Sequence, residues 1–267
     1  MRIKALFQRL REQKRPALVA YITAGDPTPD RTPDLVAALE RGGVDLVELG
    51  VPFSDPIADG PVIQSASERA LAAGTSVATV LEIAEQIRTR SEIPLLLFSY
   101  LNPILRFGVE ALARDAKRRG IDGCLLTDLS VEEADKTVAA IRAAGLDTVF
   151  LASPTSPQRR LELVAKYSTG FVYLVSRTGV TGERQNIETS LDTLVRNMRA
   201  VTDTPLAVGF GISTPEQAAE VGKLADGVVV GSAFVRLVEQ NLHNPDLEAK
   251  LEAFARSLST ALHGVTA

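Results

Sequence analysis

Short apolar runs alternate with longer amphipathic segments along the whole chain, and this rhythm constrains the fold more than any other feature. Most of the runs are continuously apolar, as expected for parallel strands that are buried on both faces. The expected strands cover residues 17–23, 45–50, 93–99, 123–127, 148–152, 171–175, 206–209 and 227–230. Eight strands separated by helical patterns predict an α/β fold, a (β/α)8 TIM barrel. A doubly wound open sheet is the alternative, but equal units without a break in composition favour a closed barrel.

Apolar residues at helical spacing predict helices between these strands. The expected helices cover residues 33–41, 77–88, 109–119, 131–144, 158–166, 191–201 and 215–221, and a last helix covers 246–262. An extra N-terminal helix is expected to plug one end of the barrel with the apolar face formed by Ile3, Leu6, Phe7 and Leu10. No linker or low-complexity stretch divides residues 1–267, so a single domain is expected.

Composition narrows the range of partners. The chain has 267 residues, 45% of them hydrophobic, which suffices for one barrel of about 250 residues. Its net charge is −4 and it has no basic run, which argues against nucleic acid or an anionic membrane as a partner. No apolar stretch approaches the ~20 residues needed to span a bilayer, and the first residues lack a signal-peptide core. A cytoplasmic protein is therefore expected.

The numbers of cysteines and histidines limit the kinds of catalytic and metal sites that the chain can form. The single cysteine, Cys124, lies in an apolar segment and cannot form an intramolecular disulfide, which fits a reducing cytoplasm and a buried, inert side chain. The two histidines, His243 and His263, are both near the C-terminus. A histidine triad, a histidine-rich metal site and an imidazole base are therefore not expected. The chemistry is left to carboxylates, tyrosines, Lys, Arg or backbone amides.

Two acidic residues lie where a buried strand ends. Glu48 belongs to an apolar run, and Asp59 follows eleven residues later in a loop rich in Pro and Gly. An ionised carboxylate in a buried strand is costly unless it is paired, so this pattern predicts an acid–base site at the catalytic face of the barrel. Glu48 shares one face of its strand with Leu46, whereas Val47 faces the other way. If the Glu48 face is the inner one, its carboxylate enters the mouth of the barrel; an ordinary salt bridge at a solvated strand end is the alternative.

Glycine-bearing segments follow the last three expected strands, at residues 176–182, 209–213 and 231–234. Glycine lets the backbone approach a ligand closely, and helix N-termini present free N–H groups to an anion. Tight turns explain most single glycines, but three such segments after consecutive strands predict a phosphate site. Tyr173, near the end of the sixth strand, is either a core residue or a pocket wall.

The stretch LVELGVPFSDPIADGP, residues 46–61, resembles the signature of the tryptophan synthase alpha chain family almost without change. The segments 23–27 (TAGDP), 176–182 and 209–213 support a resemblance that covers essentially the whole chain. It implies a lyase of tryptophan biosynthesis that cleaves indole-3-glycerol phosphate to indole and glyceraldehyde 3-phosphate by a retro-aldol step, without Schiff base or metal. It further implies that Glu48 does the acid–base work, and that Asp59 accepts a hydrogen bond from the indole N–H and stabilises positive charge.

The resemblance assigns the other site residues by position. The implied substrate-binding residues are Tyr21, Ile63, Tyr173, Thr181 and Phe210, and the implied phosphate-binding residues are Gly182, Gly211, Gly231 and Ser232. Thr181 would orient Asp59. Many family members have Phe where this chain has Tyr21.

The resemblance also implies a partner. The positions expected to face a beta subunit are Pro52, Asp55, Asn102 and Asp128. In the family's alpha2-beta2 heterotetramer, indole passes through a tunnel to pyridoxal phosphate on the beta chain, so no cofactor is expected in this chain. Thr127 and Ser130 stand where the family often has proline, which leaves the partner-facing loop less stiff.

Three alternatives remain. Another phosphate-binding barrel enzyme, such as a sugar-phosphate isomerase or indole-glycerol-phosphate synthase, uses other base and lysine constellations than the spacing of Glu48 and Asp59. A stand-alone indole-3-glycerol-phosphate lyase would share the chemistry but have no partner. A non-catalytic subunit that only activates a partner would not need both carboxylates.

Overall fold

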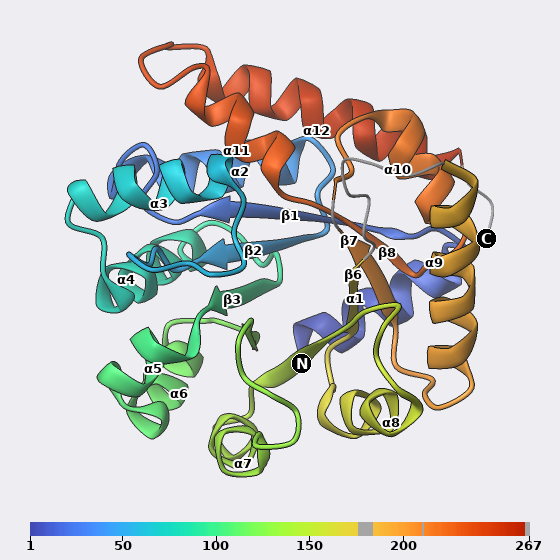
Figure 1. The fold of residues 1–267 in the computed structure, drawn as a ribbon. Helices are drawn as coiled ribbons and strands as arrows, with labels where there is room; N and C mark the ends of the chain where they lie inside the picture. Colours follow the sequence, from blue (N-terminus) through green and yellow to red (C-terminus); the bar gives the residue numbers. More distant parts are fainter. Residues whose placement is uncertain (176–183, 210, 265–267) are drawn as a thin grey trace.

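The computed structural model describes residues 1–175, 184–209 and 211–264, with the backbone alone described over 184–189. Eight parallel strands form a closed barrel in chain order, and β8 pairs with β1 to close it (Figure 1). The strands are β1 (Ala17–Thr23), β2 (Leu46–Gly50), β3 (Leu95–Ser99), β4 (Gly123–Leu126), β5 (Asp147–Ala152), β6 (Val172–Val175), β7 (Leu206–Gly209) and β8 (Gly227–Val230). The predicted (β/α)8 barrel is therefore confirmed.

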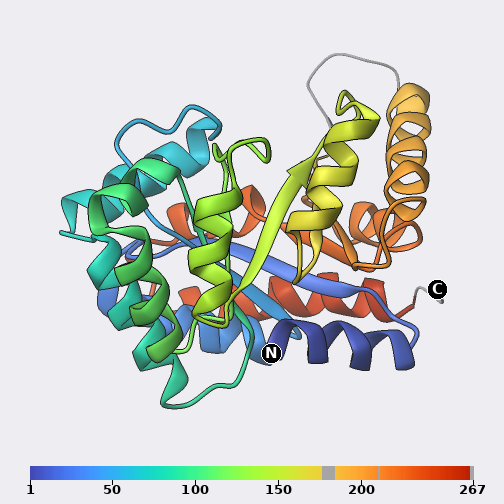
Figure 2. The ribbon, with the colours of Figure 1, turned by 90° about the horizontal axis from the view of Figure 1, so that it is seen from below.

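Helices surround the barrel in both views (Figure 1 and Figure 2). They are α1 (Arg2–Glu12), α2 (Thr32–Arg41), α3 (Pro61–Ala72), α4 (Val77–Arg88), α5 (Leu101–Phe107), α6 (Val109–Arg118), α7 (Asp135–Ala143), α8 (Gln158–Tyr167), α9 (Arg184–Arg199), α10 (Pro215–Gly222), α11 (Ser232–Glu239) and α12 (Leu247–His263), with a 3-10 turn at Pro29–Arg31. Sequence reasoning missed α3 and α5, which follow β2 and β3 directly and frame the region of Asp59.

The expected helix over residues 131–144 is wrong in its first turn, because α7 begins only at Asp135. Residues 131–133 form a turn instead, in which the Glu133 N–H donates to the Ser130 carbonyl at 3.1 Å. The Ser130 hydroxyl also hydrogen-bonds the Glu132 carboxylate. A serine at the turn offers the backbone an alternative to the helix. Val131 is still buried, which is why its apolar character resembled a helix position.

Side chains on the strands alternate between the inside of the barrel and the helices outside it. On β2, Val47 and Leu49 pack in the cluster that joins the barrel to α2 and α4. Leu46 packs in the inner cluster with residues of the other strands, and Glu48 lies two residues further on the same face. The period of two along a strand therefore directs the Glu48 carboxylate into the barrel.

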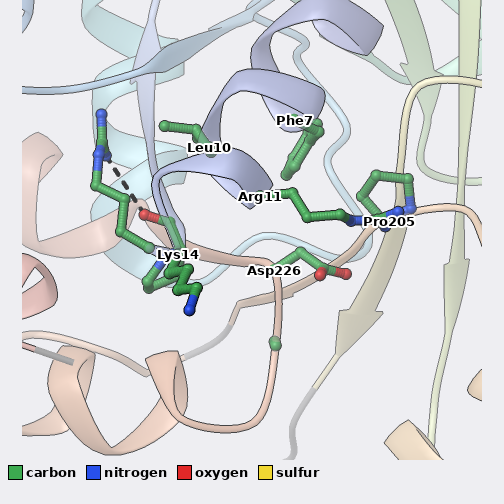
Figure 3. A pocket seen from close by; sticks show the side chains of 9 residues that line it. Phe7, Leu10, Arg11, Lys14, Pro205 and Asp226 are labelled. Carbon is green, nitrogen blue, oxygen red and sulfur yellow. Dashed lines mark hydrogen bonds between the residues drawn. The ribbon is translucent and has the colours of Figure 1, made fainter. Parts of the chain in front are cut away.

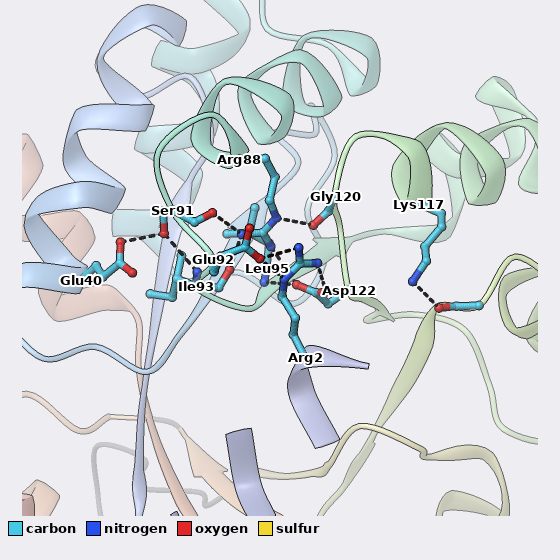
Figure 4. A network of polar contacts seen from close by, with 11 residues as sticks. Arg2, Glu40, Arg88, Ser91, Glu92, Ile93, Leu95, Lys117, Gly120 and Asp122 are labelled. Carbon is cyan, nitrogen blue, oxygen red and sulfur yellow. Dashed lines mark hydrogen bonds and ion pairs between the residues drawn. The ribbon is translucent and has the colours of Figure 1, made fainter. Parts of the chain in front are cut away.

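Helix α1 closes the end of the barrel at which the strands begin. Its apolar face packs in the inner cluster with residues such as Leu46 of β2 and Phe171, which directly precedes β6, as the sequence predicted. Arg2 at its start bonds the buried Asp122 at 3.1 Å, and Arg88 bonds the other oxygen of that carboxylate at 2.8 Å (Figure 4). The amino end of the barrel is therefore covered by α1 and held by ion pairs, so a ligand-binding site is expected at the opposite end.

Candidate active site

Glu48 lies inside the barrel near the carboxyl end of β2, level with Tyr21 of β1. The residue is 1% exposed, and its Oε1 has no hydrogen-bond partner among the described residues. Burial raises the pKa of Glu48 from 4.5 to about 8. The described residues also give it no ion-pair partner, so a salt bridge at a solvated strand end does not describe this group. At neutral pH the carboxyl group keeps its proton and can act as a general acid.

Asp59 lies in the loop between β2 and α3, half-buried. Burial raises its pKa, and a hydrogen bond from the Tyr100 hydroxyl opposes that rise. The same hydroxyl accepts the N–H of Ala58 at 3.0 Å. On the other side, Gln64 of α3 donates to the Asp59 carbonyl at 2.9 Å. The two carboxyl groups thus have different surroundings: Glu48 is enclosed in the barrel, and Asp59 is held from two sides.

Tyr21 lies close to both of these carboxyl groups. It is buried, and burial raises its pKa, with further rises from the negative charges of Asp59 and Glu48. Its hydroxyl lies against the backbone of Gly50, where a Cβ would come within 2.2 Å of the oxygen. Gly50 is therefore needed for the close approach of the ring, and that approach keeps the Tyr21 hydroxyl beside the two carboxyl groups.

Tyr173 on β6 repeats this arrangement across the barrel. Burial raises its pKa well above the usual range, and the nearby Glu48 and Tyr21 raise it further. Its hydroxyl lies against Gly209, where a Cβ would again come within 2.2 Å. Of the two sequence interpretations of Tyr173, the position beside Glu48 favours the pocket wall.

Ile63 and Phe98 complete the apolar wall beside Tyr21. Ile63 of α3 packs against the cluster of Tyr21, Ala66 and Val235. The Phe98 ring of β3 contacts the Tyr21 ring edge-on, with centroids 5.1 Å apart. Sequence reasoning named Ile63 and missed Phe98.

The sequence did carry a signal for Phe98 and Tyr100. Leu96 lies in the inner cluster of the barrel, and Phe98 and Tyr100 follow it at intervals of two. The same alternation that directs Glu48 inward therefore predicts both aromatic residues at the carboxyl end.

The proposed phosphate residues lie after β7 and β8, as far as they are described. Gly231 precedes α11, and a Cβ placed on it would lie 3.4 Å from Tyr21. Ser232 begins α11 and is exposed, and Gly211 is exposed with a positive φ of 75°. Thr181, Gly182 and Phe210 lie outside the described residues. Gly231 is thus next to Tyr21, and it lies at the start of a helix, a position that suits an anion.

The positions expected to face a partner follow strands at the same end of the barrel: Pro52, Asp55 and Asp128 lie on loops, and Asn102 lies in the first turn of α5. Asp55, Asn102 and Asp128 are exposed, whereas Pro52 is buried within this chain. The Asp128 carboxylate accepts the Leu101 N–H at 2.6 Å, which ties the loop after β4 to the start of α5.

A hollow of about 260 Å³ lies at the amino end beneath α1 (Figure 3). Its charged residues are Arg11, Lys14, Arg15 and Asp226, and of the three cations Arg11 and Lys14 are exposed. Asp226 already accepts the Leu206 N–H at 2.7 Å and pairs with Arg199 at 2.5 Å. This hollow therefore offers no counterpart to the unpartnered carboxyl group inside the barrel.

The described residues contain no group of three or more His, Cys, Asp or Glu side chains arranged to hold a metal ion. None of the helices in the described parts of the chain is long and apolar enough to cross a membrane.

The fold and the site define a (β/α)8-barrel protein with a buried, unpartnered carboxyl group toward the carboxyl ends of its strands, among the described residues. The family model described as tryptophan synthase alpha chain matches residues 7–263. The chain is 66% identical to the tryptophan synthase alpha chain of Solibacter usitatus, over 96% of both chains, and 49% identical to that of Geobacter sulfurreducens, over 98% of both. The chain therefore belongs to the tryptophan synthase alpha chain family.

Solved structures agree with this assignment. Tryptophan synthase subunit alpha from Legionella pneumophila is 38% identical, covers 99% of both chains and superposes with a TM-score of 0.92. A chain of tryptophan synthase from M. tuberculosis is 34% identical, covers 98% of both chains and has a TM-score of 0.88.

Proposed function

We propose that this chain cleaves indole-3-glycerol phosphate to indole and glyceraldehyde 3-phosphate as the alpha subunit of a tryptophan synthase, in the last steps of tryptophan biosynthesis. Membership of the family supports this function. The single observation that carries the chemistry is the unpartnered, buried carboxyl group of Glu48, whose pKa is about 8.

In this proposal Glu48 moves the protons. Cleavage of the carbon–carbon bond requires protonation at C3 of the indole ring and removal of a proton from a hydroxyl of the glycerol chain. A carboxyl group with a pKa of about 8 is protonated at neutral pH and can donate to C3. Once it has done so it is the base for the hydroxyl proton, so one group serves both transfers.

Asp59 is proposed to stabilise charge. As a carboxylate it would accept the indole N–H and offset the positive charge that develops on the ring when C3 is protonated. This role needs the ionised form, and the hydrogen bond from Tyr100 favours that form against the effect of burial. Tyr21, Ile63, Tyr173, Thr181 and Phe210 are proposed to bind the indole and glycerol parts. The phosphate is proposed to lie at Gly182, Gly211, Gly231 and Ser232.

A beta subunit is the proposed partner, in an alpha2-beta2 tetramer, with Pro52, Asp55, Asn102 and Asp128 at or near the interface. Two apolar side chains close to these positions support a docking face: Ile57 is 86% exposed and Leu105 is 56% exposed. Ile57 lies on the loop between β2 and α3 and Leu105 lies on α5, and exposed large apolar residues of this kind suit a protein interface. Pyridoxal phosphate would belong to the beta chain, and the steps assigned to this chain use its own carboxyl groups. We further propose that residues 1–267 form one cytoplasmic domain.

Indole release with and without a beta subunit tests this proposal. We expect slow release by the isolated chain and a large increase when the partner is added, because a shift of about 1 Å at a catalytic group changes rates about 100-fold. Asp55→Ala should reduce the increase more than the basal rate. A full rate without the partner, unchanged on its addition, would instead favour a stand-alone indole-3-glycerol-phosphate lyase.

A further inference from the structure

We propose that Tyr100 is a positioning residue for Asp59, which it holds in place by fixing the loop that carries this carboxyl group. This inference deepens the proposed function and rests on the role given there to Asp59. Tyr100 directly follows β3, where it caps the start of α5, and it is 3% exposed.

The hydroxyl of Tyr100 contacts the loop that carries Asp59. It accepts the N–H of Ala58, the residue before Asp59, at 3.0 Å, which fixes the backbone at this point. The hydroxyl is also close enough to the Asp59 carboxyl group to lower its pKa against the effect of burial.

The ring of Tyr100 has a separate contact with the same loop. It packs against Phe53, with centroids 5.4 Å apart, near the beginning of the loop. Phe53 lies between Pro52 and Asp55, two of the positions proposed to face or border the partner. Tyr100 therefore holds the loop at both ends, so a movement of the partner-facing part is transmitted to Asp59 through one side chain.

Tyr100 itself is held in place by its own neighbours. Its successor Leu101 donates its N–H to Asp128 at 2.6 Å. A tyrosine that is buried and fixed through the adjacent backbone loses little conformational entropy when its hydroxyl group holds a neighbour. This geometry suits a group that positions another residue.

Among the described charged and titratable groups around Asp59, Tyr100 is the one that favours its ionised form. Tyr21 of β1 and Glu48 of β2 face the site without a positive charge, and Asp128 after β4 is itself acidic. Among the described residues, Tyr100 is the one group that lowers the pKa of Asp59. Loss of its hydroxyl should therefore raise that pKa, because a hydrogen bond to the carboxylate favours the charged form.

Tyr100→Phe in the full chain tests the inference, because it removes the hydroxyl and keeps the ring. The matched control is Tyr167→Phe, whose buried tyrosine also hydrogen-bonds an aspartate, Asp135, but on α7 and α8. Asp59 would be titrated by ¹³C NMR of aspartate-labelled protein without substrate, with Asp59→Asn identifying its signal. Indole release would be measured in parallel as kcat and KM.

We expect the Asp59 titration to move to higher pH in Tyr100→Phe and to stay in place in Tyr167→Phe. The value of kcat should fall about 10- to 100-fold, with a smaller change in KM and an acid limb of the pH profile shifted upward. An unchanged Asp59 titration in Tyr100→Phe would overturn the inference, even if activity fell, because the role would then be structural. If the titration moved but the wild-type chain released no indole, the proposed function would fail and the positioning of Asp59 would stand.

Discussion

Asp45 directly precedes β2, and Glu48 lies three residues further along, within the strand; the surroundings of their two carboxyl groups differ. Asp45 receives both arms of Arg15 at 2.8 Å and the Leu18 N–H at 2.9 Å. Glu48, inside the barrel, has an oxygen without a partner among the described residues. A buried carboxylate with a full set of donors is stable, whereas an unpaired one is driven toward its protonated form.

Asp122 extends the comparison to a second strand. Preceding β4 at the amino end, it is bonded by Arg2, by Arg88 and by the Leu95 N–H at 2.9 Å (Figure 4). The paired carboxylates tie α1, α4 and the strand starts together. The unpaired one lies where a barrel of this kind has its reaction site.

Asp147 shows that a missing partner alone does not mark a site. It is buried at the start of β5, neither side-chain oxygen has a partner in the described parts of the chain, and burial raises its pKa. It differs from Glu48 in its place, because it lies at the closed amino end and not beside Tyr21 and Tyr173. The combination of an unpaired carboxyl group and the carboxyl end of the strands distinguishes the candidate site.

The largest expected effect is the loss of turnover in Glu48→Gln. Removing one positioned acid–base group lowers kcat about 10²–10⁴-fold, while the near-isosteric amide should leave substrate binding largely intact. Steady-state indole release and substrate affinity measure the two quantities. Glu92→Gln makes the same chemical change at an exposed position of the amino end and should keep full activity. If Glu48→Gln kept more than half of the wild-type rate, the unpaired carboxyl group would not be the catalytic one, and its contrast with the paired carboxylates would have no functional meaning.

The same variant should change how stability depends on pH. Below about pH 4.5 Glu48 is protonated in both states; between 4.5 and about 8 only the unfolded state ionises, so the wild-type chain loses stability as pH rises. The difference in unfolding free energy, Glu48→Gln minus wild type, should therefore increase from pH 5 to pH 8, by at most about 5 kcal/mol. Denaturant unfolding at several pH values measures it, and a flat difference would mean that Glu48 is not held protonated.

Asp122→Asn should affect stability and not turnover. Breaking a buried ion pair by removing one partner costs about 3 kcal/mol, because the arginines lose their charged acceptor. Glu92→Gln is again the control: Glu92 shares Arg2 but is 80% exposed, so its ion pair is screened by solvent and should contribute little to stability. Urea unfolding compares the stabilities of the two variants. If kcat per folded molecule also fell in Asp122→Asn, the amino end of the barrel would not be purely structural and the distinction from the carboxyl end would fail.

Much of this architecture could be predicted from local sequence. Continuous apolar runs identified the strands, and the period of two placed Glu48 and Leu46 on one face. Helices α3 and α5 were not predicted, because α3 has only three buried residues and α5 is a short segment that begins just before Pro103. Periodicity is weak over such segments.

What the sequence could not predict is which carboxyl groups are paired. Arg88 reaches Asp122 across 34 residues and Arg15 reaches Asp45 across 30, so these partners meet only in the folded barrel. The surroundings of Glu48 likewise come from β1 and β6, through Tyr21 and Tyr173. Local patterns give the face of a strand, whereas pairing depends on contacts between distant segments.

The most direct test of this account is the titration of Glu48 itself. Glutamate-labelled protein, with and without Glu48→Gln, would be followed by ¹³C NMR of the side-chain carboxyl groups from pH 3 to pH 10. The account predicts one signal that is missing in the variant and that titrates near pH 8. A Glu48 signal that titrates near the ordinary value of 4.5 would contradict the claim that the barrel keeps this carboxyl group unpaired and protonated for proton transfer.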